Sequence, residues 1–129
     1  MEDLLSNEEF IQADTEFRDG FEKALEPLNS FLKTISKPEL ILGIDVTCIG
    51  GCWRINTPIS KDYFSEESLK IKQEFIEASE PIHDYIDKFS GTGIIVGINE
   101  TFTDGVWQIK TPIVEGQCLR NWFWNKKYN

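Results

Sequence analysis

The chain has 129 residues, of which 40% are hydrophobic, and it carries a formal net charge of −9 at pH 7. This length and hydrophobic content suit a single domain, residues 1–129, with one core. The acidic balance leaves no basic stripe for phosphate contacts, which excludes that way of binding nucleic acid directly. The start of the chain lacks signal-peptide features, and no window approaches a membrane span, so we expect a cytoplasmic protein with no membrane contact.

An internal duplication organises the chain. Residues 6–59 align with residues 60–113 at an offset of 54 without a gap, and seventeen of the 54 pairs are identical. The identical pairs include Pro27/Pro81, Gly43/Gly97, Trp53/Trp107 and Ile55/Ile109. Two halves with one pattern are expected to adopt one fold, so the duplication predicts two copies of one unit around a pseudo-two-fold axis.

The first element of each copy is predicted to be a helix. Apolar residues recur every three or four positions over 10–35 and again over 64–89, which is the spacing of one buried helical stripe. Pro27 and Pro81 fall inside these stripes, where proline removes a hydrogen bond and crowds the preceding turn. We therefore expect each helix to kink at its proline or to divide in two.

Two strands are predicted to follow each helix. The β-rich runs are 40–47 and 94–101, and the return strands, in which Trp and Ile alternate with polar residues, are 52–57 and 106–111. The turns contain Gly50-Gly51 and Asp104-Gly105, pairs that tolerate positive φ and suit tight hairpins. Pro58 and Pro112 are expected to end the pairing.

Two αββ units predict an α+β domain with a four-stranded, mainly antiparallel sheet and kinked helices on one face. The C-terminal aromatic tail, residues 114–129, lies outside the repeat and contains Trp122 and Trp124. It is expected to add an edge strand, cover the core or present an aromatic contact surface.

Catalytic and metal-binding patterns are not visible. The sequence has no phosphate-binding glycine loop, no nucleophile elbow and no zinc-ligand spacing, so we expect no enzyme activity, no cofactor and no metal. His83, the only histidine, is interpreted as a solvated helix residue. Cys48 and Cys52 are interpreted as small packed side chains, because their counterparts are Phe102 and Val106.

The excess negative charge is concentrated in the predicted helical regions. Residues 1–35 carry nine acids against three bases, and residues 61–90 carry eight acids against four bases. A field of this sign speeds association with a basic partner. The side chains predicted to contact such a partner lie in the first region and are Glu8, Glu9, Asp14, Glu16 and Asp19.

The segment Leu40-Ile41-Leu42-Gly43-Ile44-Asp45 follows a helix and leads to a glycine-containing turn and an aromatic residue. It resembles the Ile-Leu-Gly-Ile-Asp segment of immunity proteins that neutralise tRNA-cleaving colicins. In that family two glycines follow the aspartate at once, whereas here residues 46–49 intervene. The resemblance implies tight binding to a basic ribonuclease toxin and obstruction of its substrate cleft, and it adds Asp45 to the partner-binding residues.

These observations favour an acidic immunity or antitoxin-like protein that inhibits a basic nuclease toxin by blocking its active site. One alternative is a phage anti-defence inhibitor that mimics nucleic acid with the same acids. Another is a small-ligand binding module at the repeat interface, in which Trp53, Arg54 and Trp107 hold an anionic ligand. The sequence leaves the oligomeric state open.

Overall fold

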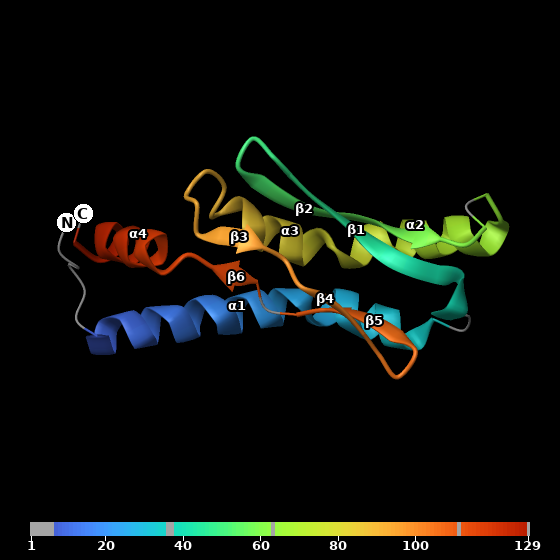
Figure 1. The fold of residues 1–129 in the computed structure, drawn as a ribbon, viewed down its shortest axis with the longest axis horizontal. Coiled ribbons are helices and arrows are strands. Elements are labelled where there is room, and N and C mark those ends of the chain that lie inside the picture. Colours follow the sequence, from blue (N-terminus) through green and yellow to red (C-terminus); the bar gives the residue numbers. More distant parts are fainter. Residues whose placement is uncertain (1–6, 36–37, 63, 111, 129) are drawn as a thin grey trace.

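A computed structural model of the chain describes residues 7–35, 38–62, 64–110 and 112–128. The fold is α+β, with helices and small antiparallel sheets, as expected (Figure 1). In chain order the elements are α1 (Asn7–Thr34), the 3-10 helix η1 (Pro38–Leu40), β1 (Ile41–Ile49), β2 (Cys52–Ser60), α2 (Glu66–Ala78), α3 (Glu80–Asp87), β3 (Ile95–Gly97), β4 (Glu100–Thr103), β5 (Val106–Ile109), β6 (Ile113–Val114) and α4 (Gly116–Tyr128).

The two prolines within the helical stripes have different outcomes. α1 is one helix of 28 residues with Pro27 inside it. The second stripe divides at Ser79, which ends α2 and precedes α3. Pro81 then lies in the first turn of α3, where its missing N–H has no intrahelical partner to lose. The expected division is therefore present in the second copy only.

The first predicted hairpin is confirmed, and the second is confirmed in part: the predicted strand 94–101 is divided into β3 and β4, of which only β4 pairs with β5. The turns of the two hairpins contain Gly50 and Gly51, with φ of 61° and 78°, and Asp104 and Gly105, with φ of 55° and 78°. Two central residues with positive φ match the right-handed twist of the flanking strands.

The prediction that Pro58 ends the first hairpin is wrong. β2 continues to Ser60, and Pro58 lies opposite Ile44 of β1. The register shifts next to this pair, between Ile44 and Val46, and an irregular position tolerates a residue that has no N–H to donate. Pro112 lies between β5 and β6 as expected, while Thr111, the predicted last residue of that strand, lies outside the described residues.

The predicted four-stranded sheet is also wrong, because the strands form three separate pairs: β1–β2, β3–β6 and β4–β5. Helix side chains form hydrogen bonds with backbone groups of the return strands. His83 accepts the N–H of Ile55 at 3.1 Å, and Asn29 bonds both the N–H and the carbonyl of Ile109, at 3.0 and 2.9 Å. These groups are no longer open to another strand, and helices cover the edges.

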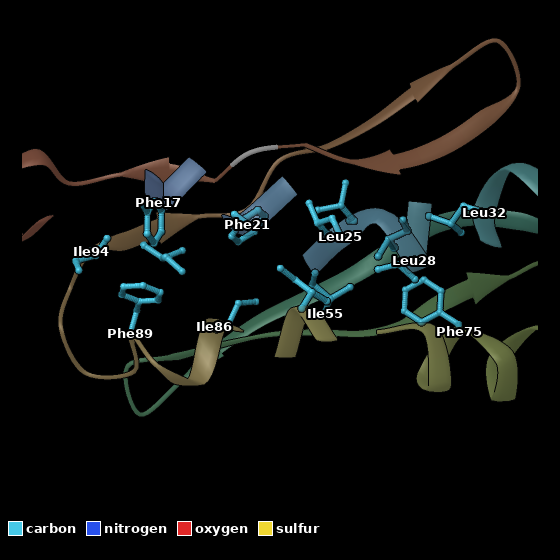
Figure 2. Packing of buried hydrophobic residues seen from close by; sticks show 14 of the residues in the cluster. Phe17, Phe21, Leu25, Leu28, Leu32, Ile55, Phe75, Ile86, Phe89 and Ile94 are labelled. Atoms are coloured by element: carbon cyan, nitrogen blue, oxygen red, sulfur yellow. The ribbon is translucent and has the colours of Figure 1, made fainter. Parts of the chain in front are cut away.

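The helices do not lie together on one face of a sheet. α1 packs against β5, and α2 and α3 pack against β2, so each helical segment covers the return strand of the other copy. The helices also pack against each other, and their buried side chains form the core with residues of both hairpins (Figure 2). Its fully buried members include Phe17, Phe21, Leu28, Ile55, Phe75 and Ile82.

Most of the C-terminal tail forms the helix α4, and among its described residues only Val114 belongs to a strand, β6, so the edge-strand expectation is wrong for the aromatic part and the core-covering expectation is confirmed. α4 lies beside the beginning of α1 (Figure 1). Its Leu119 is fully buried, and the ring of Trp122 packs on that of Phe89 with 4.8 Å between centroids. No helix among the described residues has the length and apolar character needed to cross a membrane.

Candidate partner-binding site

An acidic ridge runs along the outward face of α1. It consists of Glu8, Asp19, Glu22 and Glu26, all exposed. Their spacings of 11, 14 and 18 residues from Glu8 are close to whole numbers of helical turns, so the four carboxylates lie on one side, opposite the buried stripe. Glu8 and Glu26 are about 27 Å apart along the helix axis at 1.5 Å per residue.

The counterparts of the acidic ridge in the second copy include two acids instead of four. They are Asp62, Gln73, Ile76 and Glu80, and Ile76 is itself exposed. Asp62 precedes α2 and Glu80 begins α3, so the two counterparts on the exposed surface of α2, Gln73 and Ile76, are both uncharged. A helix of the second copy therefore forms without a continuous row of acids, so helix formation alone does not account for the acidic ridge.

The structure separates the predicted α1 residues into two groups. Glu8, Glu16 and Asp19 are exposed, whereas Glu9 accepts hydrogen bonds from Lys127 at 2.6 Å and Tyr128 at 3.2 Å. Asp14 forms an ion pair with Arg18 one turn along, at 3.0 Å. The charges of Glu9 and Asp14 are thus partly balanced within the chain. Sequence reasoning missed Glu22 and Glu26 as members of the outward face.

Asp45 lies on β1 and is not part of the acidic ridge. Its carboxylate accepts a hydrogen bond from the amide of Asn56 at 3.2 Å. Burial raises the pKa of Glu100 on β4, and the negative charge of Asp45 raises it further. The two carboxylates are thus close enough to repel each other, although they lie on different hairpins. No group of three or more potential metal ligands is found within the described part of the chain.

The residues of the ligand-binding alternative are engaged within the protein. The indole N–H of Trp53 donates to the carbonyl of Ile95 at 2.8 Å, and that of Trp107 donates to the carbonyl of Ile41 at 3.2 Å. Arg54 forms an ion pair with Asp87 of α3 at 2.7 Å. A cavity of about 470 Å³ lies beside Trp107, but its lining comes from η1, the start of β1 and the β4–β5 hairpin, without Trp53 or Arg54.

Cys52, Arg54, His83 and Asp87 form a polar cluster between β2 and α3. The hydrogen bond with Arg54 holds the pKa of Asp87 below its usual value, and the Cys52 thiol lies 3.6 Å from the same carboxylate. His83 uses its Nε2 lone pair to accept the Ile55 N–H, so this nitrogen is not available as a base toward the thiol. The cluster connects β2 to α3 through the Arg54–Asp87 ion pair and the bond from Ile55 to His83.

Two interpretations of these side chains need correction. His83 is half-buried with a backbone partner rather than solvated, and its alignment with Asn29, another side chain that can accept a backbone N–H, was the signal in the sequence. Cys48 is exposed rather than packed, whereas Cys52 is half-buried.

The half-buried imidazole predicts a pH-dependent stability. Burial lowers the pKa of His83, and the positive charge of Arg54 lowers it further. The unfolded chain therefore takes up the proton first as the pH falls below about 6.5, and the folded state loses stability in that range. We expect His83→Asn to lose less stability than the wild type between about pH 7 and about pH 5, because asparagine keeps an acceptor for the Ile55 N–H without titrating. Urea unfolding at both pH values measures the difference, and parallel losses in the two proteins would contradict it.

No family model, curated protein or solved structure matches this chain.

Proposed function

We propose that this protein is an immunity or antitoxin-like inhibitor that binds a cationic nuclease and blocks its active site, with the acidic ridge of α1 as the main contact. The observation that carries the proposal is the contrast between the four acids of the acidic ridge on one helix and their counterparts in the second copy, of which two are acids and neither of these lies on α2. A nuclease binds phosphates in a positively charged cleft, and a straight row of carboxylates is complementary to such a cleft.

A finer description of the scaffold supports this proposal. We infer that the two αββ copies are related by a pseudo-two-fold axis. The hydrogen bonds from Trp53 to Ile95 and from Trp107 to Ile41 are reciprocal at the 54-residue offset. So are the backbone bonds from Lys61 to Leu40 at 2.7 Å and from Glu115 to Ile94 at 2.8 Å. Two interlocked copies would hold α1 rigidly, which reduces the entropy lost when its carboxylates bind a partner.

The resemblance to colicin immunity proteins is confined to η1 and the beginning of β1, where Asp45 is exposed. Asp45 is retained in the proposal as a second contact, separate from the acidic ridge. Its interaction with Asn56 fixes the carboxylate on the surface of the first hairpin. Asp45→Asn is therefore expected to weaken partner binding less than changes in the acidic ridge, because it removes one charge rather than four.

Reversal of the acidic ridge tests the proposed function. The variant carries Glu8→Lys, Asp19→Lys, Glu22→Lys and Glu26→Lys. We expect the immobilised wild type to retain a cationic nuclease from lysate of its source and to suppress cleavage of RNA or DNA by that nuclease. The reversal should weaken both effects at least tenfold, because an attractive field becomes a repulsive one. Added salt should weaken the wild-type complex in the same direction.

A matched control has the same change in net charge at exposed acids of the other helical segment. It carries Glu66→Lys, Glu77→Lys, Glu80→Lys and Asp84→Lys, and we expect it to inhibit almost as well as the wild type. Circular dichroism of all three proteins checks that each is folded. An equal loss of inhibition in both variants would show that only the net charge of the protein matters and not the position of the acidic ridge. If the wild type retains no nuclease, the proposed function itself is contradicted.

A further inference from the structure

A groove lies at the end of the molecule opposite α4. It has a volume of about 450 Å³ and is lined by the last turns of α1, by η1 and by the first half of α2. We call it the far-end groove. The lining side chains that carry the following argument are Phe31, Ile35, Leu40, Ile71, Glu67 and Glu74.

The far-end groove is built from the counterparts of the surface that α4 covers. Tyr85, Phe89 and Phe17 contribute to the lining of a smaller cavity of about 200 Å³, and one wall of this cavity comes from Trp122, Phe123 and Lys126 of α4. At the 54-residue offset these three side chains correspond to Phe31, Ile35 and Ile71. The two ends of the molecule thus present equivalent apolar surfaces, and α4 occupies one of them.

The apolar side chains are buried more deeply at the end of the molecule that α4 covers than at the far-end groove. At the α4 end, Phe89 is 6% exposed and Ile94 is fully buried. Their counterparts, Ile35 and Leu40, are only half-buried in the far-end groove. The groove therefore leaves apolar surface accessible to water that the same positions hide beneath a helix at the other end.

α4 shows which chemistry this surface accepts. Trp122 packs on Phe89, with 4.8 Å between ring centroids. Lysine side chains accompany the aromatic face, since Lys126 lies over Trp122 at 4.9 Å and Lys127 pairs with Glu9 of α1. An amphipathic helix with aromatic residues on one face and lysines beside them is therefore bound by this chain once already.

We propose that the far-end groove binds an amphipathic helix of the cationic partner, with aromatic side chains against Phe31 and Ile35 and lysines beside Glu67 and Glu74. This inference rests on the proposed function for the origin of the helix. The two glutamates of the groove outnumber its one lysine, Lys70, so its rim is complementary to a basic helix. The α4 of a second copy is a poorer occupant, because Leu119 is fully buried in its own chain and would have to leave that site.

A synthetic peptide with the sequence of residues 116–128 and Cys118→Ser is a defined probe for this groove. It is titrated into the full-length, isotopically labelled protein and followed by amide chemical shifts. We expect saturable shifts at Ile35, Leu40 and Ile71, with none of similar size at Phe17 and Phe89. A peptide with Lys126→Glu and Lys127→Glu should bind about tenfold more weakly, because repulsion replaces two exposed ion pairs.

A pair of protein variants locates the binding site. Glu67→Lys with Glu74→Lys is expected to weaken peptide binding about tenfold, whereas Glu66→Lys with Glu77→Lys, on the same helix but outside the groove lining, is expected to leave it unchanged. Reversal of the acidic ridge on α1 should also leave peptide binding unchanged. Failure of the groove proposal is thereby distinguished from failure of the nuclease proposal, which depends on the acidic ridge.

Three outcomes would overturn the groove proposal. One is the absence of shifts at millimolar peptide. Another is a set of shifts centred on Phe17 and Phe89, which would show that the peptide exchanges with α4. The third is concentration-dependent dimerisation without peptide, accompanied by the same shifts at Ile35 and Leu40, which would identify a second copy as the occupant.

Discussion

Trp53→Ala and Trp107→Ala are each expected to lower the free energy of unfolding by about 3 kcal/mol. Each tryptophan lies on a return strand and donates its indole N–H to the first strand of the other copy. Both rings pack against the core. Truncation to alanine removes this packing and leaves the carbonyl of Ile95 or Ile41 without its indole partner, and both losses act in the same direction. Equilibrium urea unfolding of the two variants measures the effect.

Phenylalanine substitutions separate the two contributions of each tryptophan. Trp53→Phe and Trp107→Phe keep most of the buried ring and remove the hydrogen bond, so each should cost about 1 kcal/mol. Similar losses at the two positions are expected, because the two contacts are counterparts at the 54-residue offset. A loss below about 1 kcal/mol for either alanine variant would contradict the view that these side chains join the two copies.

Local patterns in the sequence predicted the local structure. The turns at Gly50-Gly51 and Asp104-Gly105 form because positive φ is a property of the residues themselves. The stripe over 10–35 gives α1, because helical periodicity is local as well. The tail was harder to predict, because Trp122 and Trp124 fit an extended segment, whereas the packing of Trp122 on Phe89 accompanies a helix.

The association of these elements could not be predicted in the same way. It depends on side chains that bond to backbone groups far along the chain, as Asn29 does to Ile109 across 80 residues. Periodicity shows which face of α1 is buried but not that β5 covers it. Two hairpins with buried faces are compatible with one sheet or with two separate pairs, and the bonds made by Asn29 and His83 favour separate pairs.

The sequence indicated which helix carries the candidate site but not which acidic residues of that helix face outward. The charge of residues 1–35 located it on α1. A helical wheel with a rotation of about 100° per residue would have placed Glu22 and Glu26 on the same side of the helix as Glu8 and Asp19. The pairing of Glu9 with Lys127, 118 residues away, depends on where α4 packs, and no local pattern contains that information.

Gly20→Ala is expected to destabilise the protein by about 2 kcal/mol, although alanine favours a helix over glycine by about 1 kcal/mol. A Cβ atom at Gly20 would lie 2.5 Å from the Tyr85 hydroxyl oxygen and 2.8 Å from two ring carbons. Tyr85 cannot move without loss, because its hydroxyl donates to the Phe17 carbonyl at 2.9 Å and its ring packs on Phe21 and Phe89. Burial raises the pKa of Tyr85 to about 12, with a further contribution from Glu16, so the hydroxyl keeps its proton at neutral pH.

A double-mutant cycle with Tyr85→Ala distinguishes the two effects at Gly20. When the tyrosine ring is absent, Gly20→Ala should stabilise the protein by about 1 kcal/mol, because only the helix preference remains. Urea unfolding of the four proteins measures both values. Helix preference has the same sign with or without Tyr85, so a reversal of sign can come only from the close approach of α1 and α3. Stabilisation in both backgrounds would instead show that Tyr85 moves aside at little cost.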